Sequence, residues 1–342
     1  MAKIEIKEIM QQIIGEASVR KASDCYIYPR KFGYEISYRV HQKKIVAQQL
    51  GFTTGEKLIL LFKYLAGMDV SERRKVQIGA ASFQYQSGVC RIRLSSVSDY
   101  RNHEILVLRF LHSASQTERL QFLFPNQMIK VAEKVRAHGL YLFCGPTGAG
   151  KSTTMHHLAQ KYSDRQIITI EDPVELEQET FLQLQVNDKI GLTYEKLVKV
   201  CLRSRPDLLI IGEIRDAETA KIAIRGALTG HLIFSTLHAM HAHGAIPRLK
   251  ELGVPKEELR QCLKGVIYQR LIPLVCSRCG EKCQPFCPYL SRNHAVLFDT
   301  LFFEEVFKKN ETGARWKRLL GKAWARGQIT QKTFQNELLY EN

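Results

Sequence analysis

The chain has 342 residues, of which 45% are hydrophobic and 25% are charged, a composition that is typical of a globular protein and excludes a low-complexity chain. Its 50 Lys and Arg residues exceed its 34 Asp and Glu residues and give a formal net charge of +16. Such a basic bias suits nucleic acid, an anionic membrane surface or a polyphosphate substrate, and by itself it does not distinguish among them.

The first part of the chain predicts a small α+β domain. Residues 1–111 alternate apolar and polar segments, and residues 1–24 mix charges into an amphipathic pattern that lacks the apolar core of a signal peptide. The longest apolar runs of the whole chain have the length of strands, far below the ~20 residues that span a bilayer. We therefore expect a cytoplasmic protein. An interdomain linker is expected at residues 112–127, where the periodicity is lost.

The sequence predicts a phosphate-binding loop at residues 145–153. The apolar run LYLFC at 140–144 leads directly into GPTGAGKST and then into a helical pattern. This is the G-x-x-x-x-G-K-[ST] motif with a strand before it and a helix after it, the context that supports the motif. Its glycines let backbone N–H groups point at phosphate oxygens, while Lys151 is expected to reach the β and γ phosphates and Ser152 to hold Mg²⁺. The predicted nucleotide-binding residues are Gly145, Pro146, Thr147, Gly148, Ala149, Gly150, Lys151, Ser152 and Thr153.

Three further strand-like segments predict a parallel sheet. They cover residues 166–170, 207–212 and 231–236, they are separated by helical patterns, and each ends in polar residues. Strands that alternate with helices form parallel sheets with right-handed crossovers, and ligands of such sheets lie at the carboxyl ends of the strands. We therefore expect the three polar clusters to converge on the edge that carries the phosphate-binding loop.

The acidic residues of these clusters suit phosphoryl transfer. Glu213 follows its strand and is placed to hold Mg²⁺, whereas Asp207 stands at the opposite end of the same strand and is discounted. A second carboxylate is needed to orient or deprotonate the attacking water. Glu171, Asp172 and Glu175 are the candidates for that role.

Four histidines lie between residues 230 and 244. His238 follows a predicted strand and is expected to hydrogen-bond a γ-phosphate. His231 precedes the strand and is compatible with a position in the core. His241 and His243 are expected to be loop residues, because they share no i, i+4 spacing with His238 and have no Cys or carboxylate close by in the sequence, which argues against a zinc site.

A cysteine cluster follows in the segment PLVCSRCGEKCQPFCPYL at 273–290. Its C-x₂-C and C-x₃-C pairs supply four thiolates, which suits a structural zinc ion. Three interpretations stay open, namely structural zinc, a vestigial cluster of reduced thiols, and redox regulation. The four residues are Cys276, Cys279, Cys283 and Cys287.

The last part of the chain, residues 291–342, is basic, and its pattern predicts helices, including one over VLFDTLFFEEVFKKN. Trp316 and Trp324 lie eight residues apart, near one helix face, and indicate contacts with the core or with a partner. The cations around them form either a solvated face or a docking site for an acidic partner or a membrane surface. These cations are Arg315, Lys317, Arg318, Lys322 and Arg326.

Four segments, GPTGAGKSTT, ITIEDPVE, RSRPDLLIIGEIRD and TGHLIFSTLHA, resemble in order and spacing the traffic ATPases of type II secretion and type IV pili, the GspE/PilB-like family. KASDCYIYP and LAGMDVSERRKVQIGA resemble the family's amino-terminal domain, so that the resemblance covers about residues 20–290. It implies a RecA-like P-loop NTPase domain at 128–290, with helices on both faces of a parallel sheet, that uses ATP and Mg²⁺. A smaller α+β domain at 1–111 precedes it, and a helical tail at 291–342 follows.

Matched by position, the family's catalytic residues fall on Glu175, Glu213 and His238. The arginines that its amino-terminal domain supplies to the nucleotide fall on Arg93 and Arg109, with a solvated strand residue as the alternative for each. The neighbouring Arg91 has no clear counterpart. QIG at 77–79 departs from the PQDG that the family has at this place.

The resemblance implies a homo-hexameric motor that drives assembly of a type IV-like pilus through a polytopic inner-membrane platform protein, peripheral on the inner face of the membrane. The chain looks most like the short, ComGA-like members that serve competence pili and DNA uptake. A pilus retraction ATPase and a nucleic-acid translocase or conjugation-type ATPase are the alternatives. We expect no sequence-specific nucleic-acid binding, because no helicase-like motif and no basic groove with interleaved aromatics is present.

Overall fold

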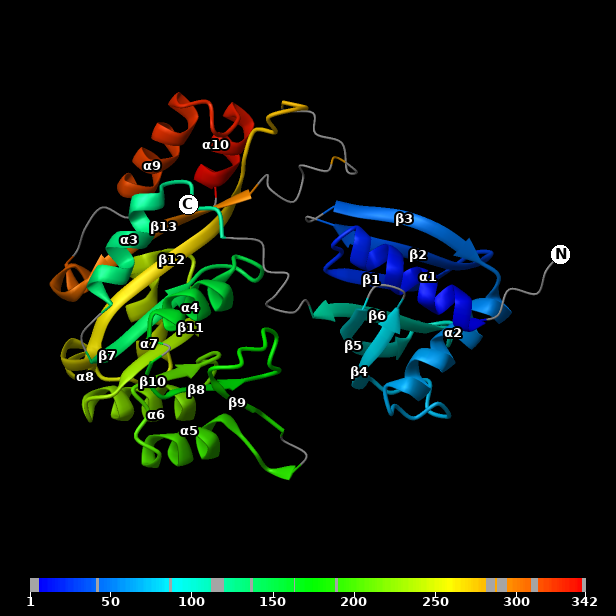
Figure 1. Cartoon of the computed structure of the whole chain (residues 1–342), viewed down its shortest axis with the longest axis horizontal. Coiled ribbons are helices and arrows are strands. Elements are labelled where there is room, and N and C mark those ends of the chain that lie inside the picture. The colour runs from blue at the N-terminus through cyan, green and yellow to red at the C-terminus, as the bar shows by residue number, and fades with distance from the viewer. Residues whose placement is uncertain are drawn as a thin grey trace. The chain divides into compact units, whose positions relative to one another are not determined.

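The computed structural model describes residues 6–40, 43–85, 88–111, 120–135, 138–162, 164–187, 190–280, 287, 294–308 and 313–339. Contacts divide the chain into two compact units, which are Met1–Gln116 with Lys282–Ser291, and Thr117–Glu281 with Arg292–Asn342 (Figure 1). The division falls inside the predicted linker 112–127. Leu123 is buried and helix α3 (Pro125–Lys134) begins within that interval, so the packed part of the second unit starts before residue 128.

The first unit is a six-stranded antiparallel sheet with two helices packed on it. Register partners Cys25, Tyr38 and Leu108 are fully buried in one core with these helices. The sheet order is β3-β2-β1-β6-β5-β4. The elements are α1 (Ile6–Val19), β1 (Asp24–Arg30), β2 (Gly33–Val40), β3 (Lys43–Leu50), α2 (Phe52–Leu65), β4 (Gln77–Tyr85), β5 (Gly88–Ser98) and β6 (Glu104–Leu111).

The second unit contains a seven-stranded sheet in the order β13-β12-β7-β11-β10-β8-β9. All neighbouring strands are parallel except the pair β12 and β13. Its strands are β7 (Gly139–Cys144), β8 (Ile167–Glu171), β9 (Leu182–Gln185), β10 (Leu208–Ile211), β11 (Leu232–Leu237), β12 (Leu263–Pro273) and β13 (His294–Phe302). Besides α3, its helices are α4 (Lys151–Ala159), η2 (Gln160–Tyr162), α5 (Tyr194–Arg203), α6 (Ala217–Leu228), η4 (Ala242–Gly244), α7 (Ala245–Glu251), α8 (Lys256–Cys262), η6 (Phe303–Phe307), α9 (Ala314–Ala325) and α10 (Gln331–Leu339).

Helices cover both faces of this sheet because successive side chains of a strand point in opposite directions. Along β7, Leu140 and Leu142 pack into a buried cluster with residues of α5, α6, α7 and α8. Tyr141 and Phe143 pack into a second cluster with residues of α3 and α4. Strands buried on both faces are typical of parallel sheets, and the predicted α/β fold is confirmed.

One part of the predicted tail is wrong. The segment expected to be helical after residue 290 begins with β13, which pairs antiparallel with β12. Every residue from Ala295 to Phe302 is buried, whereas an amphipathic surface helix buries only one stripe. A continuous apolar run at the edge of a sheet therefore forms a strand, and the longer helices of the tail begin only at Ala314.

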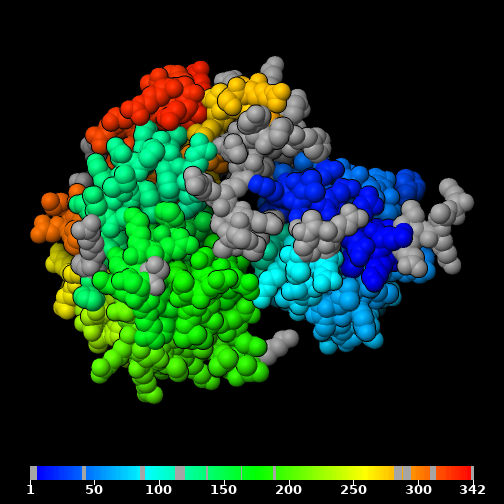
Figure 2. Space-filling view, viewed as in Figure 1, coloured from blue at the N-terminus to red at the C-terminus, as the bar shows by residue number. Residues whose placement is uncertain are grey.

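Helices α9 and α10 are fastened to the sheet by a small set of contacts. The buried Trp316 ring lies 5.5 Å from that of Tyr268 on β12, between ring centroids. Arg270 of the same strand forms an ion pair of 2.7 Å with Glu337 of α10. Figure 2 shows the two helices, in red, at the surface of the second unit. Of the helices that the structure describes, none combines the length and apolarity needed to cross a membrane.

Candidate active site

The segment 145–150 turns sharply between β7 and α4, and glycine makes this turn feasible. Gly145, Gly148 and Gly150 have φ values of 139°, 76° and 82°, which side-chain-bearing residues rarely adopt. A Cβ atom on Gly145 would also lie 2.2 Å from the carbonyl oxygen of Gln269. The loop ends in the amino terminus of α4, whose unpaired N–H groups and dipole favour an anion.

Gln269 of β12 holds this loop from the neighbouring strand. Its side chain is fully buried, and its Nε2 donates a 2.7 Å hydrogen bond to the carbonyl oxygen of Ala149. Gln269 is not among the residues predicted from the sequence. A polar side chain inside an otherwise apolar strand, VIYQRLI, was the only signal that pointed to it.

The ammonium group of Lys151 lies over the loop. Its Nζ donates hydrogen bonds of 2.9 Å to the carbonyl oxygens of Gly145 and of Pro146. Burial lowers the pKa of Lys151, while the nearby charges of Glu213 and Glu175 act in the opposite direction. These two carboxylates are therefore close enough to the lysine to interact with it electrostatically.

The polar residues that follow three strands meet beside this lysine. Glu213, after β10, accepts a 2.7 Å hydrogen bond from Nε of Arg215, and Nε2 of His238 lies 2.9 Å from its carboxylate. Arg215 also lies 3.7 Å from the carboxylate of Asp172, which follows β8. His238 follows β11, so these contacts join the three strand ends, as the alternation of strands and helices predicts. The Glu213 hydrogen bond raises the pKa of Arg215.

The three acidic candidates after β8 have different environments. Glu171 is buried, and its Oε1 accepts hydrogen bonds from Thr169, at 2.6 Å, and from Gln183, at 3.0 Å. Nε2 of His156, on α4, lies 3.8 Å from the same oxygen, and burial lowers the pKa of this histidine. Glu175 is exposed. Glu171 thus links β8 to β9 through hydrogen bonds and lies near α4, whereas Glu175 is accessible to solvent.

Three other residues of the second unit considered in the sequence analysis have different surroundings. The side chain of Asp207 accepts a 2.9 Å hydrogen bond from the backbone N–H of Gln166, at the strand end remote from the loop. His231 is half-buried, and its Nδ1 lies 3.1 Å from the carbonyl oxygen of Gly226. His243 lies in η4, near the buried Asp299 of β13, and burial lowers its pKa.

The predicted arginines lie in the first unit, on the sheet face opposite its helices. Arg93 of β5 and Arg109 of β6 are register partners. Arg109 forms a 3.0 Å ion pair with the buried Asp24 of β1, and Asp24 is in register with Arg39 of β2. Residues of four adjacent strands therefore form one row that contains three arginines. Neither Arg39 nor the contact of Asp24 is predicted from the sequence, because strand register is not visible in a single sequence.

Three of the four clustered cysteines lie together, and Cys283 lies outside the described residues. The sulfur atoms of Cys276, Cys279 and Cys287 are within 4.8 Å of one another, and the backbone N–H of Cys279 donates to the Cys276 sulfur at 3.4 Å. Within the described parts of the chain, no other group of three or more His, Cys, Asp or Glu side chains is close enough to hold a metal ion.

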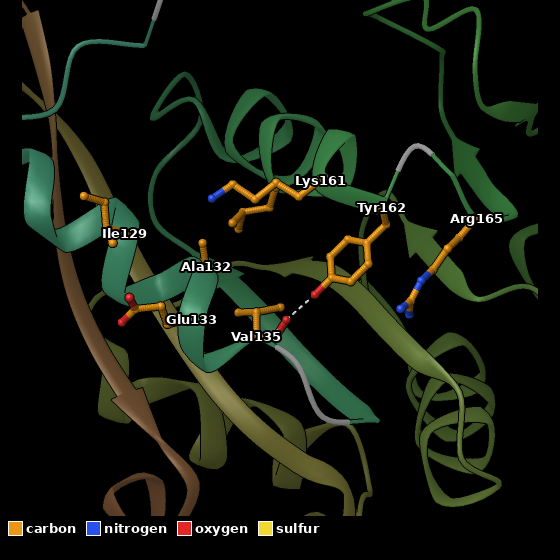
Figure 3. A pocket seen from close by; sticks show the side chains of 8 residues that line it. Ile129, Ala132, Glu133, Val135, Lys161, Tyr162 and Arg165 are labelled. Atoms are coloured by element: carbon orange, nitrogen blue, oxygen red, sulfur yellow. Dashed lines mark hydrogen bonds between the residues drawn. The ribbon is translucent and has the colours of Figure 1, made fainter.

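A pocket of about 550 Å³ lies elsewhere in the second unit (Figure 3). Its lining includes Ile129 and Ala132 of α3 and Tyr162 of η2, and the Tyr162 hydroxyl donates to the Val135 carbonyl. Helix α4 separates η2 from the phosphate-binding loop by nine residues, or about 13 Å. This pocket is therefore distinct from the candidate nucleotide site.

Comparison with known proteins gives several matches. The family model described as type II/IV secretion system protein matches residues 2–318. Competence protein ComGA of Streptococcus pneumoniae is 46% identical over 268 residues, which cover 78% of this chain and 85% of that protein. Competence protein ComGA of Bacillus subtilis is 35% identical over 353 residues, which cover 98% of this chain and 99% of that protein.

Two solved structures also match over nearly their full length. The Legionella pneumophila ATPase DotB has a TM-score of 0.74 at 20% identity and covers 99% of this chain and 97% of its own, a likeness that concerns the fold alone. The pilus retraction motor PilT, with bound ADP, has a TM-score of 0.68 at 25% identity, and the match covers 95% of this chain and 96% of the PilT chain.

The contact of Gln269 with the phosphate-binding loop predicts a specific loss of nucleotide affinity in Gln269→Leu. This substitution leaves the Ala149 carbonyl without its donor, which costs roughly 1–3 kcal/mol and loosens the loop. We expect ADP to bind about ten-fold more weakly, measured by isothermal titration calorimetry. Gln127→Leu is the matched control, because Gln127 donates a similar 2.8 Å hydrogen bond to Phe298 away from the loop. Equal ADP affinities of the two variants would contradict the role of Gln269.

Proposed function

The chain belongs to the type II/IV secretion system protein family, and from this premise we propose that it is an ATP-hydrolysing motor that drives assembly of a type IV-like pilus. The observation that carries the proposal is the convergence of three strand-end clusters on the phosphate-binding loop, with Glu213 held by His238 and Arg215. A loop that merely bound phosphate would not need a second and a third cluster of ionisable groups beside it.

The loop residues and Lys151 bind the phosphates in this proposal. Bound ATP and Mg²⁺ would supply the γ-phosphoryl group and a positive charge that polarises it. The residues present fit these groups, because the glycine turn presents backbone N–H groups, Lys151 supplies a cation, and Ser152 and Glu213 offer the oxygen ligands that Mg²⁺ prefers. His238 is proposed to act as the phosphate sensor, and its Nε2 lies 2.9 Å from the carboxylate of Glu213.

Glu175 is proposed as the residue that orients the attacking water and accepts its proton. Water would add to the γ-phosphorus as the bond to ADP breaks, and inorganic phosphate leaves. The environments of the acidic candidates support this choice. Glu171 is buried and its Oε1 accepts two hydrogen bonds from other side chains, whereas Glu175 is exposed and close enough to act on the charge of Lys151.

Arg93 and Arg109 are proposed to supply positive charge to the γ-phosphate from the first unit. The ion pair between Asp24 and Arg109 supports this role, because a guanidinium held by a buried carboxylate loses less side-chain freedom when it binds. We further propose a homo-hexamer in which nucleotide state sets the angle between the two units of each subunit.

We propose that the pilus is a competence pilus that serves DNA uptake. The support is the similarity to two competence proteins, one of which aligns over 98% of this chain. The partner in this proposal is a polytopic platform protein of the inner membrane, with the motor in the cytoplasm, peripheral on that membrane. The likeness to a pilus retraction motor, at 25% identity, keeps retraction as the second candidate.

A structural zinc ion is also proposed, at the cysteine cluster. In a tetrahedral four-sulfur site the ion lies about 2.3 Å from each sulfur, and neighbouring sulfurs are about 3.8 Å apart. The three described sulfurs, within 4.8 Å of one another, fit such a site, and Cys283 is the fourth candidate ligand. The N–H of Cys279 that donates to the Cys276 sulfur would stabilise the thiolate form of that ligand.

Two substitutions separate binding from hydrolysis. Lys151→Ala is expected to abolish nucleotide binding, while Glu175→Gln keeps the affinity for ATP and lowers kcat by at least about 100-fold, because the amide cannot accept the proton. A fluorescent ATP analogue measures binding, and phosphate release measures turnover. Glu177→Gln is the matched control, since this exposed carboxylate lies two residues further on. Robust turnover by Glu175→Gln would transfer the role to Glu171 or Asp172.

Zinc binding predicts about one zinc ion per purified chain, measured by mass spectrometry of the metal content. Cys276→Ala should lose the ion and lower the melting temperature, because a structural metal contributes to folding. Cys90→Ala, which removes a buried thiol of the first unit, should keep the ion. If wild-type protein purified without chelators contains no zinc, and its clustered thiols react freely with a thiol reagent, the cluster is vestigial.

A further inference from the structure

On one face, helix α9 carries three exposed cations, Lys317, Arg318 and Lys322, that have no role in the proposed ATPase site, whereas Arg326 at its end lies over the Phe124 ring. Its other side is buried against the second unit through Trp316, Leu320 and Ala323. The side chains exposed along α9 and at its end are mostly basic. Besides Ala314 and Ala325, they are Arg315, Lys317, Arg318, Lys322, Trp324 and Arg326.

No negative charge on α9 or α10 offsets these cations. Helix α9 contains no acidic residue. Glu337, the acidic residue of α10, is buried and paired with Arg270, and Arg315 lies 3.7 Å from the buried Asp299. The described ion pairs of this region therefore leave Lys317, Arg318 and Lys322 facing solvent. The positive electrostatic potential of these three cations attracts a negatively charged surface.

An aromatic side chain lies on the edge of the same face. Trp324 follows Lys317 by seven residues, which is close to two helical turns, so both lie on nearly the same side of α9. The indole is 45% exposed, and its ring stacks on Phe334 of α10 with ring centroids 5.3 Å apart. Tryptophan side chains with a solvent-exposed edge and an apolar ring face are enriched at the headgroup level of bilayers.

We propose that this face of α9 binds the surface of a bilayer that contains anionic phospholipid. Each lysine or arginine next to an anionic bilayer adds a similar electrostatic contribution to the binding free energy, and this attraction does not require a shaped pocket. An interfacial tryptophan adds a further favourable contribution. A single nucleic-acid strand fits the face less well, because proteins grip such strands by stacking bases on free aromatic rings, and one ring face of Trp324 is already stacked on Phe334.

This inference deepens the peripheral localisation in the proposed function, but it requires no protein in the membrane. The test therefore uses the full chain and protein-free vesicles, made either of phosphatidylcholine alone or of equal parts of phosphatidylcholine and phosphatidylglycerol. Cosedimentation measures binding at low and at high salt. ATP hydrolysis of each variant without vesicles distinguishes failure of the lipid site from failure of the motor.

The variant with Lys317→Glu, Arg318→Glu and Lys322→Glu reverses the charge of the face. Its matched control, with Lys250→Glu, Lys256→Glu and Arg260→Glu, reverses three exposed cations of α7 and α8, where Glu251, Glu257 and Glu258 already offset the charge. We expect wild type and control to bind phosphatidylglycerol vesicles, and the α9 variant to bind at least about ten-fold more weakly. Hydrolysis should be the same in all three proteins.

A second readout follows Trp324 itself. Its fluorescence should be quenched by brominated lipid in phosphatidylglycerol vesicles, and Trp324→Phe should remove most of the quenching, since Trp316 is buried. The proposal would be overturned if wild type bound phosphatidylcholine vesicles as tightly as phosphatidylglycerol vesicles. It would also be overturned if the α9 variant and the control lost binding equally, or if brominated lipid did not quench Trp324. So would short DNA that binds wild type, and not the α9 variant, while vesicles bind neither.

Discussion

The parallel pairing of β7 with β11 and β12 is the constraint on which the candidate site depends. Parallel strands place their carboxyl ends at one edge, so the loop after β7, Glu213 after β10 and His238 after β11 have to meet there. The same pairing brings Gln269 beside the loop. Burial of the central strands on both faces makes the edge rigid, which is what a site for phosphoryl transfer requires, since its catalysis is mostly positioning.

Much of the second unit could be predicted because its signals are local. The phosphate-binding motif, with an apolar strand before it and a helix after it, needs no tertiary information, and the strands at 140–144 and 231–236 lie within a residue or so of β7 and β11. The strand β13 was missed because a short buried apolar run has no periodicity that tells a strand from a helix. Gln269 and Arg39 were missed for a different reason, since the contact of Gln269 with the loop and the place of Arg39 in the arginine row arise from strand pairing.

The basic residues of the chain lie in two kinds of environment, one in the first unit and one on α9. Arg39, Arg93 and Arg109 form a row with the buried Asp24 on one face of the first unit, where a carboxylate holds one of them. The exposed cations of α9 have no such partner within α9 and α10. A net charge of +16 therefore does not require a nucleic-acid groove, because the arginine row proposed to bind a polyphosphate and the helix face proposed to bind lipid both contribute to this charge.

The central claim, that the chain is a motor ATPase and not a nucleic-acid translocase, is tested most directly by ATP hydrolysis. The purified protein is assayed with Mg²⁺ at low salt, with and without single- and double-stranded DNA. The account predicts slow, Mg²⁺-dependent turnover that DNA leaves unchanged, because the missing stimulus comes from a membrane partner. Stimulation by DNA of about ten-fold or more would contradict it, since strong coupling of turnover to the polymer is the behaviour of a translocase.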